Sequence, residues 1–312
     1  MANCEQRIKT FKGQVRAAVT VFRVNILHSV RDIRWIFLFF VMIVIIVRYV
    51  SPYVSYGLSR HERCTWCLLP LLMRTAPNAM NNSRVVLHAG MILLLCDAPF
   101  FREITPYAVL RSKRNGWWKG ECLYIFGASL IYTGFIVFVS SVITLPVISF
   151  ENSWKGVVQD FLYGSDQYTS AQLNSSAPHY AVDELVVRYI YPYSAQLYLF
   201  TACFASFSVL GLIMYLFALK WKNSRLGIAA AFFIVLLDPV VNYNMGSYTY
   251  WLAAFSPVSW CSVDRLDLLR EEYFLSPLFT ACAYTSLIAV LVFLIRRVSI
   301  RSEVDLVRET AD

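Results

Sequence analysis

The chain has 312 residues, of which 58% are hydrophobic and only 15% charged, with a mean hydropathy of +0.53. Several apolar runs exceed the ~20 residues that a helix needs to cross a bilayer, which excludes an ordinary water-soluble protein and predicts an integral membrane protein. The net charge of +8 does not predict nucleic-acid binding, because the basic residues flank the apolar runs, where Lys and Arg set the orientation of a membrane protein.

Residues 1–34 are predicted to form a cytoplasmic amphipathic segment. Apolar residues recur there at intervals of three and four, so we expect a helix that lies on the membrane surface. Its lysines and arginines would reach lipid head groups; a free soluble arm is the alternative. The apolar positions are Ile8, Phe11, Val15, Val19, Phe22, Ile26 and Val30.

Residues 35–297 are predicted to form one all-α transmembrane domain of six helices, followed by a cytoplasmic tail, 298–312. The segments assigned to the inside hold 19 of the 28 Lys and Arg residues, and an even number of spans keeps both termini with that excess. The protein is therefore expected to be a multi-pass protein of the cell membrane with both termini cytoplasmic. The expected spans lie at about 35–56, 85–96, 121–149, 194–219, 226–241 and 273–295, with an earlier start of the second span, near residue 79, left open.

Ionisable residues interrupt three of these spans: Arg48 the first, His88 the second and Asp238 the fifth. Such groups are costly inside a membrane, so each is a candidate for lining a polar translocation path. Other interpretations stay open. Arg48 could reach the outer surface, His88 could be a hydrogen-bonded packing residue, and Asp238 could cap a helix broken by Pro239.

The outer segments carry few functional signals. Cys64 and Cys67 lie near His61, but three ligands at this spacing predict no metal site, and a disulfide or two unpaired thiols is favoured. Residues 150–190 are expected to be a partly ordered loop. Residues 245–272 are aromatic and polar, which predicts a re-entrant segment before the last span, with a helix start at Ser256-Pro257.

The segment 101–119 joins the second and third spans and is predicted to be a cytoplasmic hairpin. Thr105 before Pro106 is typical of a helix start, and Asn115-Gly116 of a helix end, so we expect a short basic helix. A plain connector would not need such a helix, which favours a cytoplasmic binding partner. The basic residues of the hairpin are Arg102, Arg111, Lys113, Arg114 and Lys119.

No motif for catalysis or nucleotide binding occurs in the chain. We find no glycine-rich phosphate loop with its lysine, no nucleophile elbow and no paired intramembrane carboxylates. The sequence therefore predicts a protein that is not an enzyme and binds no cofactor of its own.

A resemblance to a known family adds to this picture. The hairpin, with Asp97-Ala-Pro-Phe-Phe-Arg-Glu-Ile-Thr-Pro-Tyr at its start, and the stretch Ser256-Pro-Val-Ser-Trp260 resemble permease subunits of bacterial type-2 ABC transporters. The layout is similar too, with its amphipathic leader, six spans, helical first inner loop and re-entrant outer segment.

The resemblance implies an exporter permease, one half of a homodimer or heterodimer, working by alternating access. ATP and Mg²⁺ would bind a separate ATP-binding cassette subunit, which contacts the coupling helix through Pro106, Tyr107, Leu110 and Arg111. Spans two and five would line the path. Lipid is the other expected partner, and nucleic acid is not. The alternative is a non-transporting immunity or sensor subunit that docks a cytoplasmic partner through the same hairpin.

Overall fold

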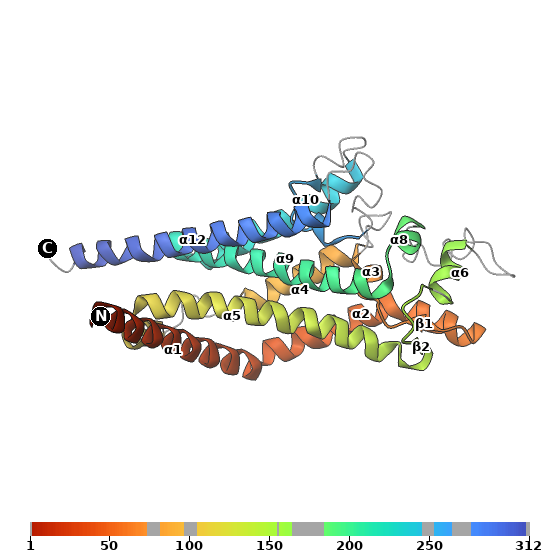
Figure 1. Ribbon diagram of the computed structural model, residues 1–312, viewed down its shortest axis with the longest axis horizontal. Coiled ribbons are helices and arrows are strands. Elements are labelled where there is room, and N and C mark those ends of the chain that lie inside the picture. The colour runs from red at the N-terminus through yellow and green to blue at the C-terminus, as the bar shows by residue number, and fades with distance from the viewer. Residues whose placement is uncertain are drawn as a thin grey trace.

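Seven helices of 13 residues or more build the described part of the chain, and they lie along one elongated bundle (Figure 1). The computed structural model describes residues 2–73, 82–96, 105–154, 156–163, 184–244, 253–263 and 276–309. Both ends of the chain lie at the same end of the bundle (Figure 1). The seven helices are α1 (Ala2–Arg31), α2 (Ile33–Arg60), α4 (Ser83–Leu95), α5 (Thr105–Ile143), α9 (Pro192–Trp221), α10 (Ser224–Asn244) and α12 (Pro277–Glu309).

Four of the predicted spans coincide with helices that are long and apolar enough to cross a membrane. These helices are Ile33–Arg60, the Gly116–Ile143 part of α5, Pro192–Trp221 and the Pro277–Ile300 part of α12. The predicted second span lies in α4, whose 13 residues rise about 20 Å, less than the ~30 Å hydrocarbon core. The fifth lies in α10, which is not among the four. Six crossings therefore stay a prediction, whereas an all-α multi-pass membrane protein agrees with the structure.

Several helix ends follow from local chemistry. Asp32 is extended, and its side chain accepts a hydrogen bond from the Arg34 N–H, so it caps the start of α2. The third predicted span ends before residue 149, since α5 ends at Ile143 and Pro146 lies in the 3₁₀ turn η2 (Leu145–Val147). Lys222 adopts a left-handed conformation and ends α9, which forms a tight turn into α10.

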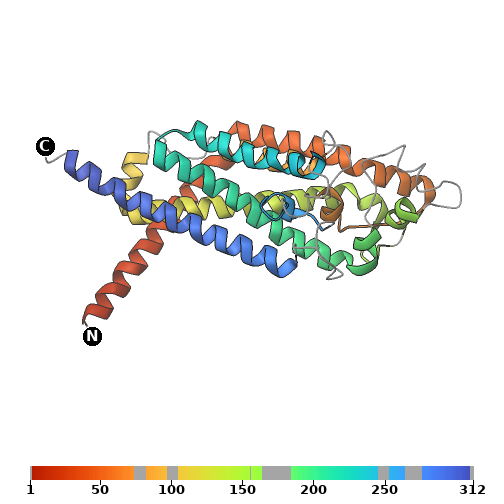
Figure 2. The ribbon, with the colours of Figure 1, turned by 90° about the horizontal axis from the view of Figure 1, so that it is seen from above.

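The helix that begins at Thr105 does not end where it was predicted to end. We expected Asn115-Gly116 to stop it, but α5 continues as one helix of 39 residues to Ile143. Figure 2 shows the first turns of α5 turned away from the line of the remaining helix. A glycine within a helix permits a bend without ending the hydrogen-bonded ladder, so the expected stop acts at most as a change of direction.

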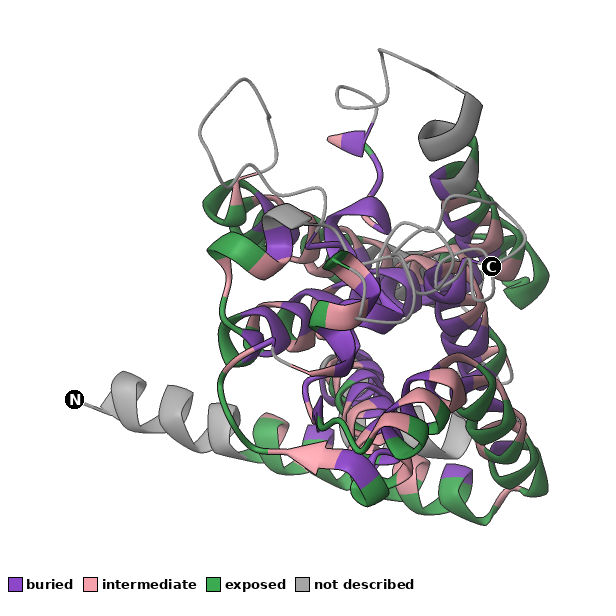
Figure 3. Ribbon diagram, turned by 90° about the vertical axis from the view of Figure 1, so that its right-hand side faces the viewer, coloured by how far each residue is buried: buried purple, intermediate pink, exposed green. Residues whose placement is uncertain are grey.

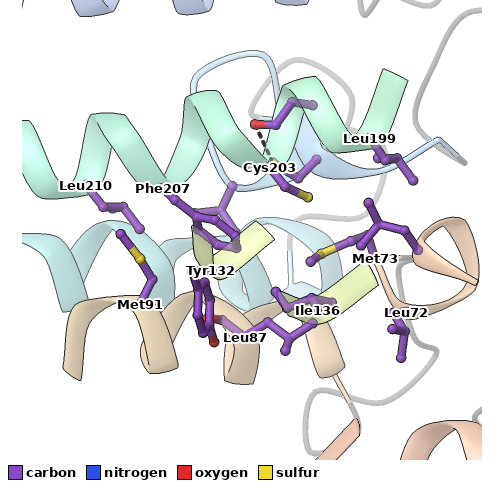
Figure 4. Packing of buried hydrophobic residues seen from close by; sticks show 14 of the residues in the cluster. Leu72, Met73, Leu87, Met91, Tyr132, Ile136, Leu199, Cys203, Phe207 and Leu210 are labelled. Carbon is purple, nitrogen blue, oxygen red and sulfur yellow. Dashed lines mark hydrogen bonds between the residues drawn. The ribbon is translucent and has the colours of Figure 1, made fainter. Parts of the chain in front are cut away.

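The core of the bundle lies between α4, α5 and α9. The Tyr132 ring of α5 packs against Phe207 of α9 at 5.2 Å, and its hydroxyl donates to the Leu87 carbonyl of α4 at 2.9 Å (Figure 4). In the most apolar stretch of α9, 67% of the residues are buried, compared with 22% in the corresponding stretches of α2 and α12. An end-on view shows the buried residues gathered inside the bundle and the exposed ones around it (Figure 3). Thus α9 is central, and α2 and α12 are peripheral.

The N-terminal helix α1 packs along α5. A Cβ atom at Gly120 would lie 2.6 Å from Val21, so only glycine permits this approach. Asn25 donates to Glu121 at 3.0 Å, and the hydroxyls of Ser29 and Tyr124 are 2.8 Å apart. The contact between α1 and α5 is therefore partly polar.

The predicted apolar stripe of α1 does not form one contact face. Phe22 and Ile26 are half-buried against the core, whereas Val15, Val19 and Val30 are exposed. Among the side chains of α1 that the structure describes, the buried ones are Ala18, Val21 and Ser29, none of which belongs to the predicted stripe. Whether the exposed face of α1 meets lipid stays a prediction.

The end of the bundle opposite the chain termini has more ordered structure than a loop. Strand β1 (Cys64–Thr65) pairs in parallel with β2 (Ile148–Ser149), and the short helix α3 (Leu69–Leu72) is fully buried. Two further helices, α6 (Val157–Tyr163) and α8 (Glu184–Tyr189), lie within the segment expected to be a partly ordered loop.

Candidate functional site

The Asp238 carboxylate is the centre of a buried polar cluster. Arg84 Nη2 donates to both of its oxygens, at 3.0 Å to Oδ1 and 2.8 Å to Oδ2. Asn82 Nδ2 donates to Oδ2 at 3.2 Å, and the Ser259 hydroxyl donates to Oδ1 at 2.6 Å. These hydrogen bonds connect α10 to the start of α4 and to the 3₁₀ turn η4 (Ser259–Cys261). We call these residues, with His88 and Ser206, the Asp238 cluster.

The charges of this cluster are removed from solvent. The side chains of Arg84 and Asp238 both have 0% of their area exposed. Moving two charges out of water is expensive, and their mutual attraction offsets that cost only with good geometry and further hydrogen bonds. Asn82 and Ser259 supply those bonds. A buried ion pair is weak evidence for a stabilising role, so its presence between two helices points toward function or specificity.

His88 extends the cluster one helical turn along α4. Its Nδ1 lies 2.7 Å from the Arg84 carbonyl oxygen, which can only accept, so we assign the proton to Nδ1. In the neutral ring, Nε2 then accepts from the Ser206 hydroxyl of α9 at 3.0 Å. Phe207 packs against the ring edge-to-face at 4.9 Å. The histidine therefore connects the ion pair to the central helix.

The segment 253–263 closes one side of the cluster. Trp260 is buried against α12, 4.9 Å from the Tyr284 ring, and its Nε1 donates to the Ala253 carbonyl at 3.0 Å. The Tyr284 hydroxyl lies 2.6 Å from the Pro257 carbonyl. The Ser256 hydroxyl accepts from the Ser259 N–H at 3.4 Å. The predicted helix start at Ser256-Pro257 is wrong, because the 3₁₀ turn η4 begins at Ser259, after Val258. This turn places the Ser259 hydroxyl on Asp238.

The structure brings together two of the three predicted path residues. His88 and Asp238 belong to one buried cluster, whereas Arg48 is exposed on α2. His88 is buried and hydrogen-bonded, which agrees with the packing interpretation, and its role in a translocation path stays a prediction. The end-capping interpretation of Asp238 is wrong, because α10 continues through Pro239 to Asn244 and the carboxylate faces α4 and η4 instead.

The predicted partner contact falls on the first turns of α5. Pro106, Tyr107, Leu110 and Arg111 are helical, as expected, but their side chains lie outside the part of the chain that the structure describes. Their role in docking a partner stays a prediction.

The two cysteines at the opposite end of the bundle show no sign of a redox site. Cys64 and Cys67 are buried free thiols, which agrees with the unpaired alternative and not with a disulfide. Burial raises the pKa of each thiol to about 12, so both stay protonated and unreactive near neutral pH. Across the described residues, no group of three His, Cys, Asp or Glu side chains is placed to hold a metal ion.

Sequence reasoning missed the partners of Asp238. Arg84 lies just before the residue at which the second span was expected to begin, and Asn82, Ser206 and Ser259 were not singled out at all. One signal was present: Arg84 and His88 are four residues apart, which places both on one face of a helix. The pairing of Arg84 with Asp238 spans 154 positions, and no local pattern contains that information.

The arrangement holds a positive and a negative charge away from water. Every oxygen of Asp238 is engaged by donors from the protein. What it can do is exchange partners: if α4 and α10 separate, a positive and a negative group become available to a passing molecule. Comparison with known proteins adds no candidate, since no family model, curated protein or solved structure matches the chain.

Proposed function

We propose that this chain is the permease subunit of an ABC exporter, driven by a separate ATP-hydrolysing subunit. The observation that carries the proposal is the buried Arg84–Asp238 ion pair between α4 and α10. These helices contain the second and fifth predicted spans, which line the path in the family that the sequence resembles. A membrane protein keeps a charge pair in an apolar bundle at a cost, and a translocation path is a common reason.

In this mechanism the path between α4 and α10 is closed by the ion pair in the state described here. ATP binding would draw the partner subunits together and move the first turns of α5. The rocking of the two permease copies would then separate α4 from α10 and expose Arg84 and Asp238 to cargo. Separation on one side and closure on the other is alternating access.

The basic first turns of α5 supply the test of partner binding. The double variant Tyr107→Ala with Arg111→Glu removes an aromatic and reverses a charge at the proposed contact. Truncation of such a contact residue costs about 2 kcal/mol or more, so binding should weaken by about thirtyfold. The measurement is co-purification, from the native host, of an ATP-hydrolysing subunit with the tagged chain.

The matched control is Arg225→Ala, an exposed basic residue at the start of α10, which should retain the partner. A chain that purifies without any ATP-hydrolysing subunit contradicts the proposal. A cytoplasmic partner without ATPase activity, lost in the same double variant, would instead support the non-transporting immunity or sensor subunit.

A further inference from the structure

Helix α12 holds the segment 253–263 through one tyrosine hydroxyl. Tyr284 of α12 donates from this hydroxyl to the Pro257 carbonyl oxygen at 2.6 Å. The same hydroxyl lies 3.1 Å from the Cys261 thiol. These two contacts lie on either side of Ser259 in the chain. Tyr284 is itself buried, so the hydroxyl meets these partners without competition from water.

Trp260 adds a second set of contacts between the segment and the bundle. Its ring packs edge-to-face against the Tyr284 ring, with 4.9 Å between the centroids. Its carbonyl oxygen accepts from the Tyr198 hydroxyl of α9 at 3.2 Å. The Tyr198 hydroxyl also lies 3.0 Å from the Thr280 hydroxyl of α12. Helices α9 and α12 therefore support the turn η4 together.

Ser259 connects this support to the buried charges. Its hydroxyl donates to Asp238 Oδ1 at 2.6 Å. An O–H···O hydrogen bond needs a separation of about 2.5–3.0 Å, so a displacement of the turn by about 1 Å would break it. Since Pro257 and Cys261 flank Ser259, the Tyr284 hydroxyl fixes the position from which Ser259 reaches the carboxylate.

We propose that Tyr284 is a positioning residue for the Asp238 carboxylate and acts through Ser259. In the described part of the chain, the Tyr284 hydroxyl bonds to the segment 253–263 and not to the ion pair, so its effect passes through the turn. A shift of α12 away from this segment withdraws Ser259 from Oδ1 and leaves Arg84 as a donor to the carboxylate. The inference goes beyond the proposed transport function, because this coupling needs neither a partner subunit nor cargo.

A double-mutant cycle on the full chain in detergent tests the coupling. Tyr284→Phe removes the hydroxyl and keeps the ring against Trp260. If Tyr284 acts through Ser259, the Ser259 hydroxyl has less to lose in this background. Ser259→Ala should then change the unfolding equilibrium constant at least about twofold less than it does in the wild-type chain, as expected within one hydrogen-bond network. Equal changes in the two backgrounds overturn the proposal.

Tyr132→Phe is the matched control for this cycle. The Tyr132 hydroxyl is also buried and donates to a backbone carbonyl, that of Leu87 in α4, at 2.9 Å. Ser259→Ala should therefore cost as much in the Tyr132→Phe background as in the wild-type chain. A coupling as large as that with Tyr284→Phe would reflect a general weakening of the bundle, and the proposal would then fail.

Amide hydrogen exchange, followed by mass spectrometry, gives a local measurement. The Ser259 and Cys261 amides donate to carbonyls of the same segment at 3.0 and 3.2 Å. Tyr284→Phe should speed their exchange about fivefold, the effect of one lost buried hydrogen bond, whereas Tyr132→Phe should not. Exchange as slow as in the wild-type chain, or equally fast in both variants, contradicts the proposal. The chain is measured without a partner, so neither result bears on partner binding through α5.

Discussion

Two places in the molecule put an aspartate beside an arginine, and they differ in every physical respect. Arg84 and Asp238 come from different helices and are fully buried. Asp32 and Arg34 are two residues apart at a helix start, where Arg34 is exposed and Asp32 half-buried. Asn82 and Ser259 donate further hydrogen bonds to the first carboxylate, whereas Asp32 caps the start of α2.

The comparison shows how far each charge depends on the charge beside it. In the buried pair, each charge is stable only while its partner is present, so the two must be treated as a unit. Asp32 accepts from the backbone N–H of Arg34, and solvent reaches both residues, so either charge can be changed alone. Removal of one charge should therefore be severe at the first place and mild at the second.

The largest effect is expected when one charge of the buried pair is removed. Asp238→Asn leaves Arg84 buried beside a neutral amide, and the free energy of unfolding should fall by about 3–5 kcal/mol. Unfolding by a denaturing detergent, followed by loss of helical circular dichroism, measures the change.

The double variant Arg84→Met with Asp238→Leu serves as the control, because it removes both charges. It should be more stable than either single variant, as double-mutant cycles on buried pairs lead us to expect. Additive losses in the double variant would contradict the interpretation of the pair as one unit.

Ser259→Ala tests the support of the carboxylate by the segment 253–263. It removes the 2.6 Å hydrogen bond to Oδ1 but leaves Arg84 in place. Since the acceptor is charged, the free energy of unfolding should fall by about 1–3 kcal/mol. The same unfolding measurement applies, with Ser286→Ala on exposed α12 surface as the control. Equal stability of the two variants would show that η4 is held by its apolar contacts alone.

The thiols Cys64 and Cys67 extend the comparison to buried groups without a countercharge. Burial raises the pKa of each to about 12 in the folded chain, against about 8.5 when unfolded. The folded chain therefore keeps protons that the unfolded chain releases, so stability is full below pH ~8.5 and falls from there to pH ~12. Each thiol should contribute a loss of up to about 1.4 kcal/mol per pH unit.

Unfolding measured between pH 8 and 10 checks this slope. Replacement of both cysteines by alanine should make the slope shallower, and the native thiols should resist maleimide at pH 7 until the chain is unfolded. Rapid labelling of either thiol in the folded chain would show that it is accessible, and hence that its burial is wrong.

The smallest effect is expected at Arg48. Its side chain is exposed on α2, so Arg48→Gln should change the free energy of unfolding by no more than about 0.5 kcal/mol. A loss comparable to that of Asp238→Asn would instead favour the interpretation in which Arg48 lines a polar path inside the bundle.

Local signals predicted much of this fold, and long-range contacts account for what they missed. The cap at Asp32 was not singled out, but the apolar run after it placed α2 within a few residues at each end. The charge-free run 194–219 placed α9 equally well, and the start of α5 at Thr105 was also correct. The spacing of apolar residues and the capping of a helix depend on residues close together in the chain. A single sequence is therefore enough to recognise them.

The site was predictable only in part, for the same reason. An acid in an apolar run marked Asp238, and a histidine in another marked His88, but nothing nearby in sequence shows that they share a cluster. Arg84 looked like a loop residue because the start of α4 was placed one residue after it. The pairing of β1 with β2 joins segments more than 80 residues apart and was likewise missed.

The central claim is that α4 and α10 separate during ATP turnover. Spin labels on cysteines replacing the exposed residues Leu93 on α4 and Leu236 on α10 report the distance between these two helices. The measurement is pulsed electron–electron double resonance on the complex with its ATP-hydrolysing partner, without nucleotide and with ATP and vanadate. We predict a second, longer distance when nucleotide is trapped. One unchanged distance in both states, with the partner bound and hydrolysing ATP, would contradict alternating access through this pair of helices.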